Sequence, residues 1–262
     1  MSSPEPGDSR ALPVLYEDEH LLVLDKPGGP AAIRGEGDPE QPVLESLLQQ
    51  GIHDGKPWAV ERGLEFLRSI HCLDADASGV WVLARSAAVR VELVNQFNAG
   101  KPLASFLALT HGTPLERRFG VNLRMGPHPE AVGRMRVDAR GGRKSVTRFE
   151  LVEAFAGCTL WRCHPATDRL HQIRLHLRSR RLPVVSDPVY DGKPLFLSAI
   201  KPGYRFKRHQ DERPLIARAA LHCEAVELKH PATGQSLRVE APLPKDFEVA
   251  LKYLRRFAGN PR

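Results

Sequence analysis

Two carboxylates in the segment HCLDADASG at 71–79 are the side chains best placed for chemistry. Asp74 and Asp76 come directly before GVWVLAR at 79–85, a continuous apolar run typical of a buried strand. A carboxylate fixed against a core and partly removed from water can serve as a nucleophile or general base. The same residues could instead form only turn hydrogen bonds. They could also be the acid pair of a glycosidase, whose carboxyl groups flank the bond at ~5–9.5 Å.

A second polar group occupies TDRLHQIRLH at 167–176. Asp168 is predicted to cap the N-terminus of a helix over 170–181. Three arginines recur at i, i+4 and i+7 of that helix: Arg174, Arg178 and Arg181. A guanidinium beside a carboxylate keeps the acid ionised, so the stripe predicts either the partner of a catalytic acid or an ordinary solvated face. His171 and His176 are five residues apart and do not share a helix face, which argues against a metal pair.

The segment 193–213 combines cations with aromatic rings. Its members are Lys193, Lys201, Arg205, Lys207, Arg208 and Arg213, with Phe196, Tyr204 and Phe206 between them. Cations contact phosphates and aromatic rings stack on bases, so this composition favours RNA binding. A basic surface loop without a partner is the alternative.

The overall composition is that of a globular chain with a basic balance. The 262 residues are 42% hydrophobic and 26% charged, and the formal net charge of +7 favours a polyanionic partner. No apolar run approaches the ~18–20 residues of a membrane span, and the first ten residues lack a signal-peptide core. We therefore expect a cytoplasmic location. Four cysteines without CxxC spacing predict reduced thiols, and no phosphate-binding or dinucleotide glycine motif is present.

Apolar and alternating runs predict strands that three or four helices interrupt. Strands are expected at 14–16, 21–24, 79–85 and 105–110, in several runs between 117 and 163, and in a closing hairpin at 218–228 and 236–240. Helices are expected at 43–50, 87–98, 170–181 and 245–257. Because strands and helices do not alternate strictly, the pattern favours an α+β fold.

Four stretches, in this order, resemble the motifs of the RluA-type family of RNA pseudouridine synthases. They are VLYEDEHLLVLDKPGG at 14–29, HCLDADASG at 71–79, ATDRLHQIRLHL with LPVVSDPVYDG over 166–192, and LHCEAVELKHPATGQSLRVEAPLPKDF at 221–247. The resemblance covers about residues 12–250. It implies the catalytic fold of that family, a mixed, mainly antiparallel sheet with flanking helices and a central cleft.

The resemblance also implies an isomerase. Such enzymes detach a uracil from its ribose, turn it and rejoin it through C5, with no metal or organic cofactor. Asp74 is similar in position to the catalytic aspartate, which would attack C1′ or remove a C2′ proton, and Arg174 to the arginine that pairs with it. Implied substrate contacts are Phe106, His71, Arg169, Ile173 and Leu175. Implied RNA contacts are Arg178, Arg181, Lys201, Arg205 and Lys207.

Five positions depart from the family pattern. Cys72 replaces an arginine that helps to displace the base, and Ala77 replaces a threonine. Phe106 occupies the place of a tyrosine and has no hydroxyl to help move the C5 proton. Asp168 and Leu170 replace a glycine and a threonine. The retained Asp74 and Arg174 favour an active enzyme, and a catalytically impaired RNA-binding homologue is the alternative.

For domain organisation we expect a disordered tail at 1–11 and one catalytic domain at 12–258. The basic loop lies at about 193–213, and no separate N-terminal RNA-binding domain is expected. The expected partner is ribosomal or transfer RNA, bound by a monomer without a nucleotide cofactor and without a membrane.

Overall fold

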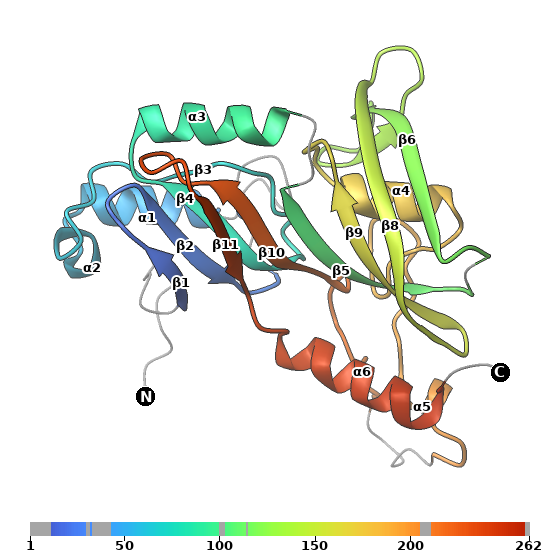
Figure 1. Cartoon of the computed structure of the whole chain (residues 1–262). Coiled ribbons are helices and arrows are strands. Elements are labelled where there is room, and N and C mark those ends of the chain that lie inside the picture. Colours follow the sequence, from blue (N-terminus) through green and yellow to red (C-terminus); the bar gives the residue numbers. More distant parts are fainter. Residues whose placement is uncertain are drawn as a thin grey trace.

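One sheet connects all the strands of this computed structural model, which describes residues 12–29, 32, 43–99, 103–113, 115–204 and 211–259. The strand order is β1-β2-β4-β10-β5-β9-β8-β6-β7, with β3 paired to β4 and β11 paired to β10. All pairs are antiparallel except β4 with β10. This confirms the predicted mixed, mainly antiparallel sheet with flanking helices (Figure 1).

The elements have the following bounds. The strands are β1 (Val14–Glu17), β2 (Leu21–Lys26), β3 (Arg68–Ser69), β4 (Ser78–Ala84), β5 (Ala104–His111), β6 (Arg118–Pro127), β7 (Met135–Val137), β8 (Arg143–Phe155), β9 (Cys158–Pro165), β10 (Leu221–Lys229) and β11 (Ser236–Glu240). The helices are α1 (Leu44–His53), α2 (Pro57–Val60), α3 (Ala87–Asn98), α4 (Gln172–Ser179), α5 (Leu197–Ile200) and α6 (Lys245–Phe257).

The strand β4 lies in the core of the N-terminal half. All seven of its residues are buried, because β2 and β10 flank it and α3 packs against it. The second residue of β4 must be glycine. Gly79 has a φ of 107°, which side chains rarely allow, and a Cβ at this position would lie 2.1 Å from the Cys223 carbonyl oxygen. Any side chain there would push β4 away from β10 and displace the loop that precedes it.

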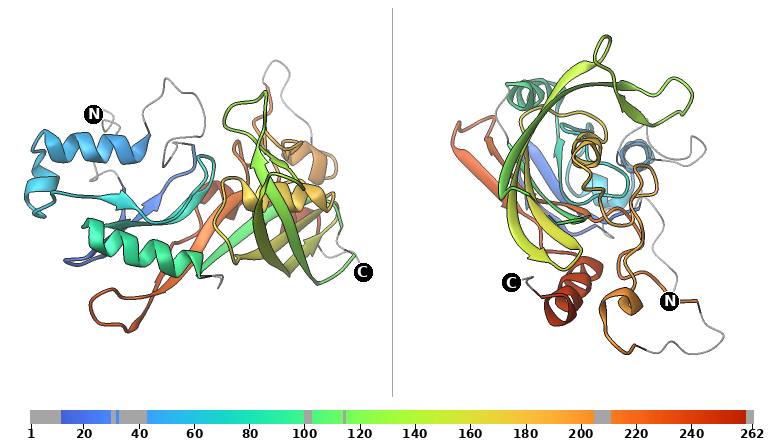
Figure 2. Two further views of the ribbon diagram at one scale, coloured as in Figure 1. Left: turned by 90° about the horizontal axis from the view of Figure 1, so that it is seen from above. Right: turned by 90° about the vertical axis from the view of Figure 1, so that its right-hand side faces the viewer.

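In the other half, the strands curl around α4. Figure 2 shows β6 and β8 as an arc around this helix, and α4 also packs on β7 and β9. Six consecutive residues of α4, 172–177, are buried because strands surround it, so it cannot be a solvated helix. The polar side chains of α4 therefore point into protein or into a site.

The predicted helices differ from the structure mainly at α4. Helices 87–98 and 245–257 match α3 and α6, whereas α4 spans only Gln172–Ser179 of the predicted 170–181. His171 and Arg181 have φ values of 53° and 60°, and these left-handed residues delimit the helix. The prediction that Asp168 caps it is wrong, because His171 is the cap residue and the Asp168 carboxylate accepts a hydrogen bond from Cys72. The expected tail at 1–11 lies outside the described residues.

None of the helices in the described ranges combines the length and the apolar character needed to cross a membrane.

Candidate active site

Asp74 is fixed in the loop between β3 and β4. Its side chain is buried, and its Oδ1 accepts a hydrogen bond of 3.2 Å from the backbone N–H of His171. Its Oδ2 lies 3.5 Å from Nη1 of Arg174. The loop and the start of α4 are 97 residues apart in sequence, so the sheet brings them together. The arrangement holds one carboxylate against one guanidinium.

Arg174 has a second and closer partner. Its Nε and Nη2 donate to the two carboxylate oxygens of Asp187, at 2.8 and 2.7 Å, a bidentate pair buried from solvent. Asp76 Oδ2 lies 3.7 Å from Nη2, and the guanidinium also lies over the ring of Tyr190. Burial lowers the pKa of Arg174, but the Asp187 hydrogen bonds and the three carboxylate charges raise it well above its ordinary value. The guanidinium is thus a permanent cation among three acids.

Two further cations hold the backbone of the Asp74 loop. The fully buried Lys26 donates from Nζ to the carbonyl oxygens of Pro27, Ala75 and Ala77 at 3.0, 2.8 and 2.8 Å. Arg218 donates to the Asp76 carbonyl oxygen at 2.8 Å and pairs with Asp246. These bonds reach the three carbonyl groups of residues 75–77, directly after Asp74, so they hold in place the loop that carries its side chain.

The Arg218 side chain needs the glycine at position 28. A Cβ at Gly28 would lie 2.3 Å from the Arg218 side chain, so this glycine provides the space in which the arginine crosses. The sequence analysis quoted the Lys-Pro-Gly-Gly segment at 26–29 as part of a family motif, without a role for its glycines. The structure shows that it also supports the candidate site.

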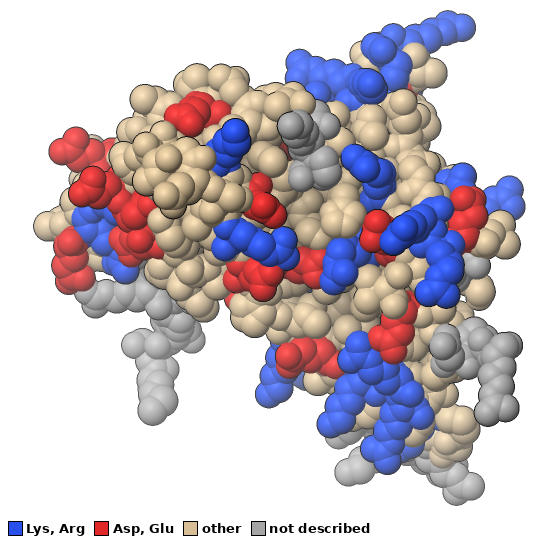
Figure 3. Space-filling model, viewed as in Figure 1, with Lys and Arg blue, Asp and Glu red and all other residues tan. Residues whose placement is uncertain are grey.

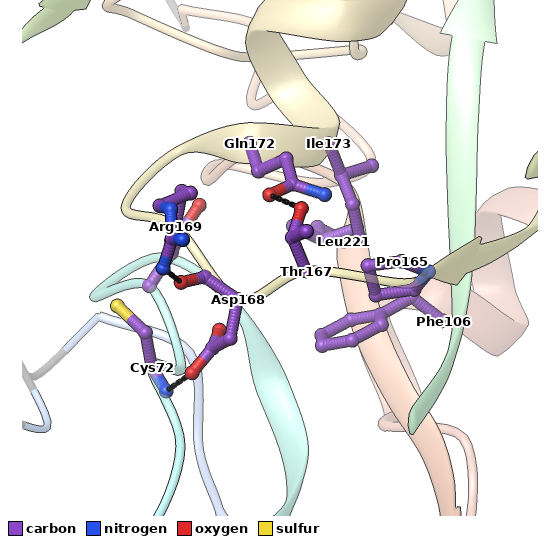
Figure 4. A pocket seen from close by; sticks show the side chains of 10 residues that line it. Cys72, Phe106, Pro165, Thr167, Asp168, Arg169, Gln172, Ile173 and Leu221 are labelled. Atoms are coloured by element: carbon purple, nitrogen blue, oxygen red, sulfur yellow. Dashed lines mark hydrogen bonds between the residues drawn. The ribbon is translucent and has the colours of Figure 1, made fainter. Parts of the chain in front are cut away.

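Asp74 lines a pocket. Figure 4 shows Phe106 and Pro165 on one side of this pocket and Cys72, Asp168 and Arg169 on the other. The pocket has about 320 Å³ of space outside protein atoms, part of it open to solvent. Its lining residues are Cys72, Asp74, Phe106, Pro165, Thr167, Asp168, Arg169, Gln172, Ile173 and Leu221. An apolar face with a few convergent polar groups suits one face of a flat, uncharged ring.

Asp168 is the second carboxylate of this pocket. Its Oδ2 accepts a 2.7 Å hydrogen bond from the backbone N–H of Cys72. Burial raises the pKa of Asp168 to about 6, and the charge of Asp74 adds to this, while the Cys72 bond and Arg169 act in the opposite direction. In the described part of the chain, Arg169 Nε is the only buried side-chain nitrogen or oxygen atom without a hydrogen-bond partner. Such a donor at a pocket wall is available to a ligand.

The structure brings some predicted substrate contacts together and separates others. Phe106, Arg169 and Ile173 line the pocket with Asp74. His71 does not reach it, in contrast to the expectation, because its ring stacks on Phe97 and its Nε2 accepts from the Val82 N–H. Burial lowers the pKa of His71 to about 4, so this ring is a neutral core group. Leu175 is also away from the pocket.

Leu175, a residue of α4, packs in a small apolar cluster with Met125 and Tyr190. It lies two residues after Ile173 and therefore faces a different side of the helix. The hydroxyl of Tyr190 lies 2.9 Å from His171 Nδ1, so this cluster supports the residue whose N–H contacts Asp74. Leu175 thus contributes to packing behind the site.

The structure describes three of the five predicted RNA contacts. Arg178 pairs with the exposed Asp191, Arg181 is exposed, and Lys201 lies over the rings of Tyr204 and Phe257. Arg205 and Lys207 lie outside the described residues. Of the three described residues, Arg178 and Arg181 thus lie at the end of α4, whereas Lys201 packs on α6.

A stronger basic surface, which sequence reasoning missed, covers the β6–β7–β8 region. We call residues 117–148 the basic arm. It contains nine Lys and Arg and two Asp and Glu, a formal charge of +7 that equals the charge of the whole chain. All nine cations are exposed: Arg117, Arg118, Arg124, Arg134, Arg136, Arg140, Arg143, Lys144 and Arg148. Figure 3 shows Lys and Arg side chains protruding at this end. A count of charge by segment would have revealed it.

Comparisons with known proteins agree with this geometry. Residues 20–179 match a family model described as RNA pseudouridylate synthase. Ribosomal large subunit pseudouridine synthase D of Xanthomonas campestris is 35% identical over 246 residues, which cover 93% of this chain and 70% of that protein. Synthase C of Escherichia coli is 32% identical over 244 residues, 92% of this chain and 70% of that protein. Synthase D of Nitrosomonas europaea is 33% identical over 244 residues, which cover 93% of this chain but only 65% of that protein.

A solved structure also shares the fold. Human RNA Pseudouridylate Synthase Domain Containing 4 superposes with a TM-score of 0.67 at 20% identity, covering 94% of this chain and 95% of that chain. At this identity the likeness concerns the arrangement of strands and helices.

Proposed function

Since this chain belongs to the RNA pseudouridylate synthase family, we propose that it isomerises a uridine in large-subunit ribosomal RNA, with Asp74 as the catalytic carboxylate. The observation that carries the proposal is the position of Asp74, which lines a pocket with an apolar wall and lies 3.5 Å from a buried guanidinium. The comparisons give no support to a catalytically impaired homologue. Asp76, the second acid of the glycosidase alternative, is absent from the pocket lining.

Different residues of the site would bind the base and act on the ribose. The apolar wall of Phe106, Pro165 and Leu221 would hold a uracil that has left its stack. Asp74 would act on the ribose at the pocket mouth, either on C1′ or on the C2′ proton. Arg174 would hold that carboxylate in position, because its own orientation is fixed by the bidentate bond to Asp187. These steps use side chains of this chain alone, and a monomer would suffice.

Ribosomal RNA is the proposed substrate because the relatives carry that name and the basic arm supplies a surface for a folded polyanion. The test uses RNA labelled with tritium at uridine C5, since formation of the C5–C1′ bond releases that hydrogen. We expect release from large-subunit ribosomal RNA and none from transfer RNA. Release from transfer RNA alone would reject the substrate. No release from either RNA, at concentrations where RNA binds, would reject the activity.

A prediction about the basic arm follows from its charge. The triple variant Arg136→Gln, Arg140→Gln, Arg143→Gln should weaken RNA binding and lower the slope of log affinity against log salt by about 2, because each phosphate contact releases counterions. Turnover at saturating RNA should stay close to wild type, because the arm does not line the pocket. Filter binding between 50 and 300 mM salt measures the slope.

The matched control removes three exposed cations from elsewhere, by Lys56→Gln, Arg68→Gln and Arg238→Gln. It lowers the net charge by the same amount. A difference between the two triple variants in RNA binding therefore comes from the basic arm and not from the net charge of the protein. Equal slopes for the two triple variants would show that the arm makes no special contact.

A further inference from the structure

The pocket contains two carboxylates in unlike surroundings. Asp74 lies beside Arg174, whereas no Lys or Arg of the described residues forms an ion pair with Asp168. The two acids are close enough for the charge of Asp74 to act on Asp168. Two acids in such unlike surroundings commonly take different roles in one reaction.

Of the two carboxylate oxygens of Asp168, one accepts a hydrogen bond from the protein and the other accepts none from the described residues. Oδ2 is held by the Cys72 N–H, and no hydrogen bond from the described residues reaches Oδ1. Figure 4 shows this group on the wall formed with Cys72, across the pocket from Phe106 and Pro165. A ring held on the apolar wall would present its edge to that free oxygen.

The proposed activity needs a second proton acceptor at that edge. When C5 of the detached uracil bonds to C1′, C5 carries both the new bond and its original hydrogen, and the ring holds an N1=C6 double bond. The hydrogen must then leave C5. Asp74 lies on the ribose side, and the Thr167 and Gln172 side chains are hydrogen-bonded to each other at 2.8 Å. Asp168 is the remaining carboxylate of the lining.

We propose that Asp168 is a catalytic base that takes the C5 proton of the rejoined uracil, an inference that rests on the proposed pseudouridine synthase activity. The C5–H bond breaks, its electron pair becomes the C5=C6 double bond, and the proton passes to Oδ1 of Asp168. The N1=C6 pair moves to N1, which takes a proton from solvent. Asp168 then returns its proton to water, so atoms and electrons balance without a co-reactant.

The surroundings of Asp168 suit this role. The groups that act on it are Asp74 from the β3–β4 loop, Arg169 on its own segment and Cys223 from β10. With a pKa of about 6, the carboxyl group is mostly ionised at neutral pH and a stronger base than an ordinary aspartate. Its base form is lost as the pH falls through about 6, so the C5 step should slow on the acid side.

The variant Asp168→Asn separates catalysis from structure. An amide oxygen can still accept the Cys72 N–H, so the loop stays attached, but the proton acceptor is gone. Burial makes ionisation of Asp168 unfavourable in the folded state, so stability from this group is lost as the pH rises from about 4 to about 6. The variant should therefore melt at the same or a higher temperature than wild type at pH 7.5, which confirms folding.

The experiment measures single-turnover pseudouridine formation on RNA that carries either hydrogen or deuterium at uridine C5, with the same two RNAs for each protein. We expect Asp168→Asn to be about 10²-fold slower or more, with a larger C5 isotope effect and without the inflection near pH 6. Asp168→Gly should be slow as well, and added formate should restore part of its rate by entering the vacated space.

Two results would overturn the proposal. Asp168→Asn within threefold of wild type, or slow without a larger isotope effect, would leave Asp168 as a support of the Cys72 loop. Failure of the activity itself is a distinct outcome, because wild type would then form no pseudouridine at all.

Discussion

Asp74→Asn should reduce pseudouridine formation by about 10³-fold or more at saturating RNA. The amide can still accept the 3.2 Å hydrogen bond from His171, so the geometry of the loop is retained. It lacks the negative charge that either an attack on C1′ or removal of the C2′ proton requires. Tritium release in a single turnover measures the loss, and filter binding should show unchanged RNA affinity.

The matched control is Asp76→Asn. It removes a carboxylate that belongs to the same loop and lies near the same guanidinium, that of Arg174. Asp76 lies 3.7 Å from Arg174 but does not line the pocket, so its loss should lower the rate by less than about tenfold. Both variants should fold, because the bidentate pair of Arg174 with Asp187 remains. Equal rates for the two variants would remove Asp74 from its catalytic role.

The sequence predicted the parts of the fold that depend on local patterns. The continuous apolar run at 79–85 became the buried β4, and the apolar spacing of 245–257 became α6 with Phe247, Ala250, Leu251 and Leu254 in the core. The resemblance to a family located Asp74 and Arg174, which the structure places 3.5 Å apart. Family motifs can locate site residues because the site requires particular side chains at particular positions in the sequence.

The sequence could not supply the contacts that depend on three-dimensional arrangement. Asp187 was part of a quoted motif, yet nothing in its spacing showed that it, and not Asp74, makes the bidentate pair with Arg174. The helical spacing at 170–181 predicted a helix beginning near Asp168. The left-handed conformation of His171 shortens that helix and directs its N–H toward Asp74. A strained backbone residue of this kind follows from tertiary contacts that a periodicity does not contain.

Arg174→Met should destabilise the protein and abolish its activity. It leaves the fully buried Asp187 and the nearly buried Asp74 without their shared cation, a cost of about 3–5 kcal/mol for a broken buried pair. Arg174 lowers the pKa of Asp187 despite its burial, so the stability it provides is present at neutral pH and lost as the pH falls through the lowered pKa. Urea unfolding should show the full deficit at pH 7.5 and a smaller one only at about pH 3, below the ordinary pKa of an aspartate.

Two comparisons separate the structural from the catalytic part of this effect. Arg178→Met removes an exposed arginine of the same helix, paired only with the exposed Asp191, and should change stability by less than about 0.5 kcal/mol. Adding Asp187→Leu to Arg174→Met removes the stranded charge and should recover part of the stability. Activity should stay lost in that double variant, because Asp74 still lacks its guanidinium. Recovered activity would mean that Arg174 serves the fold alone.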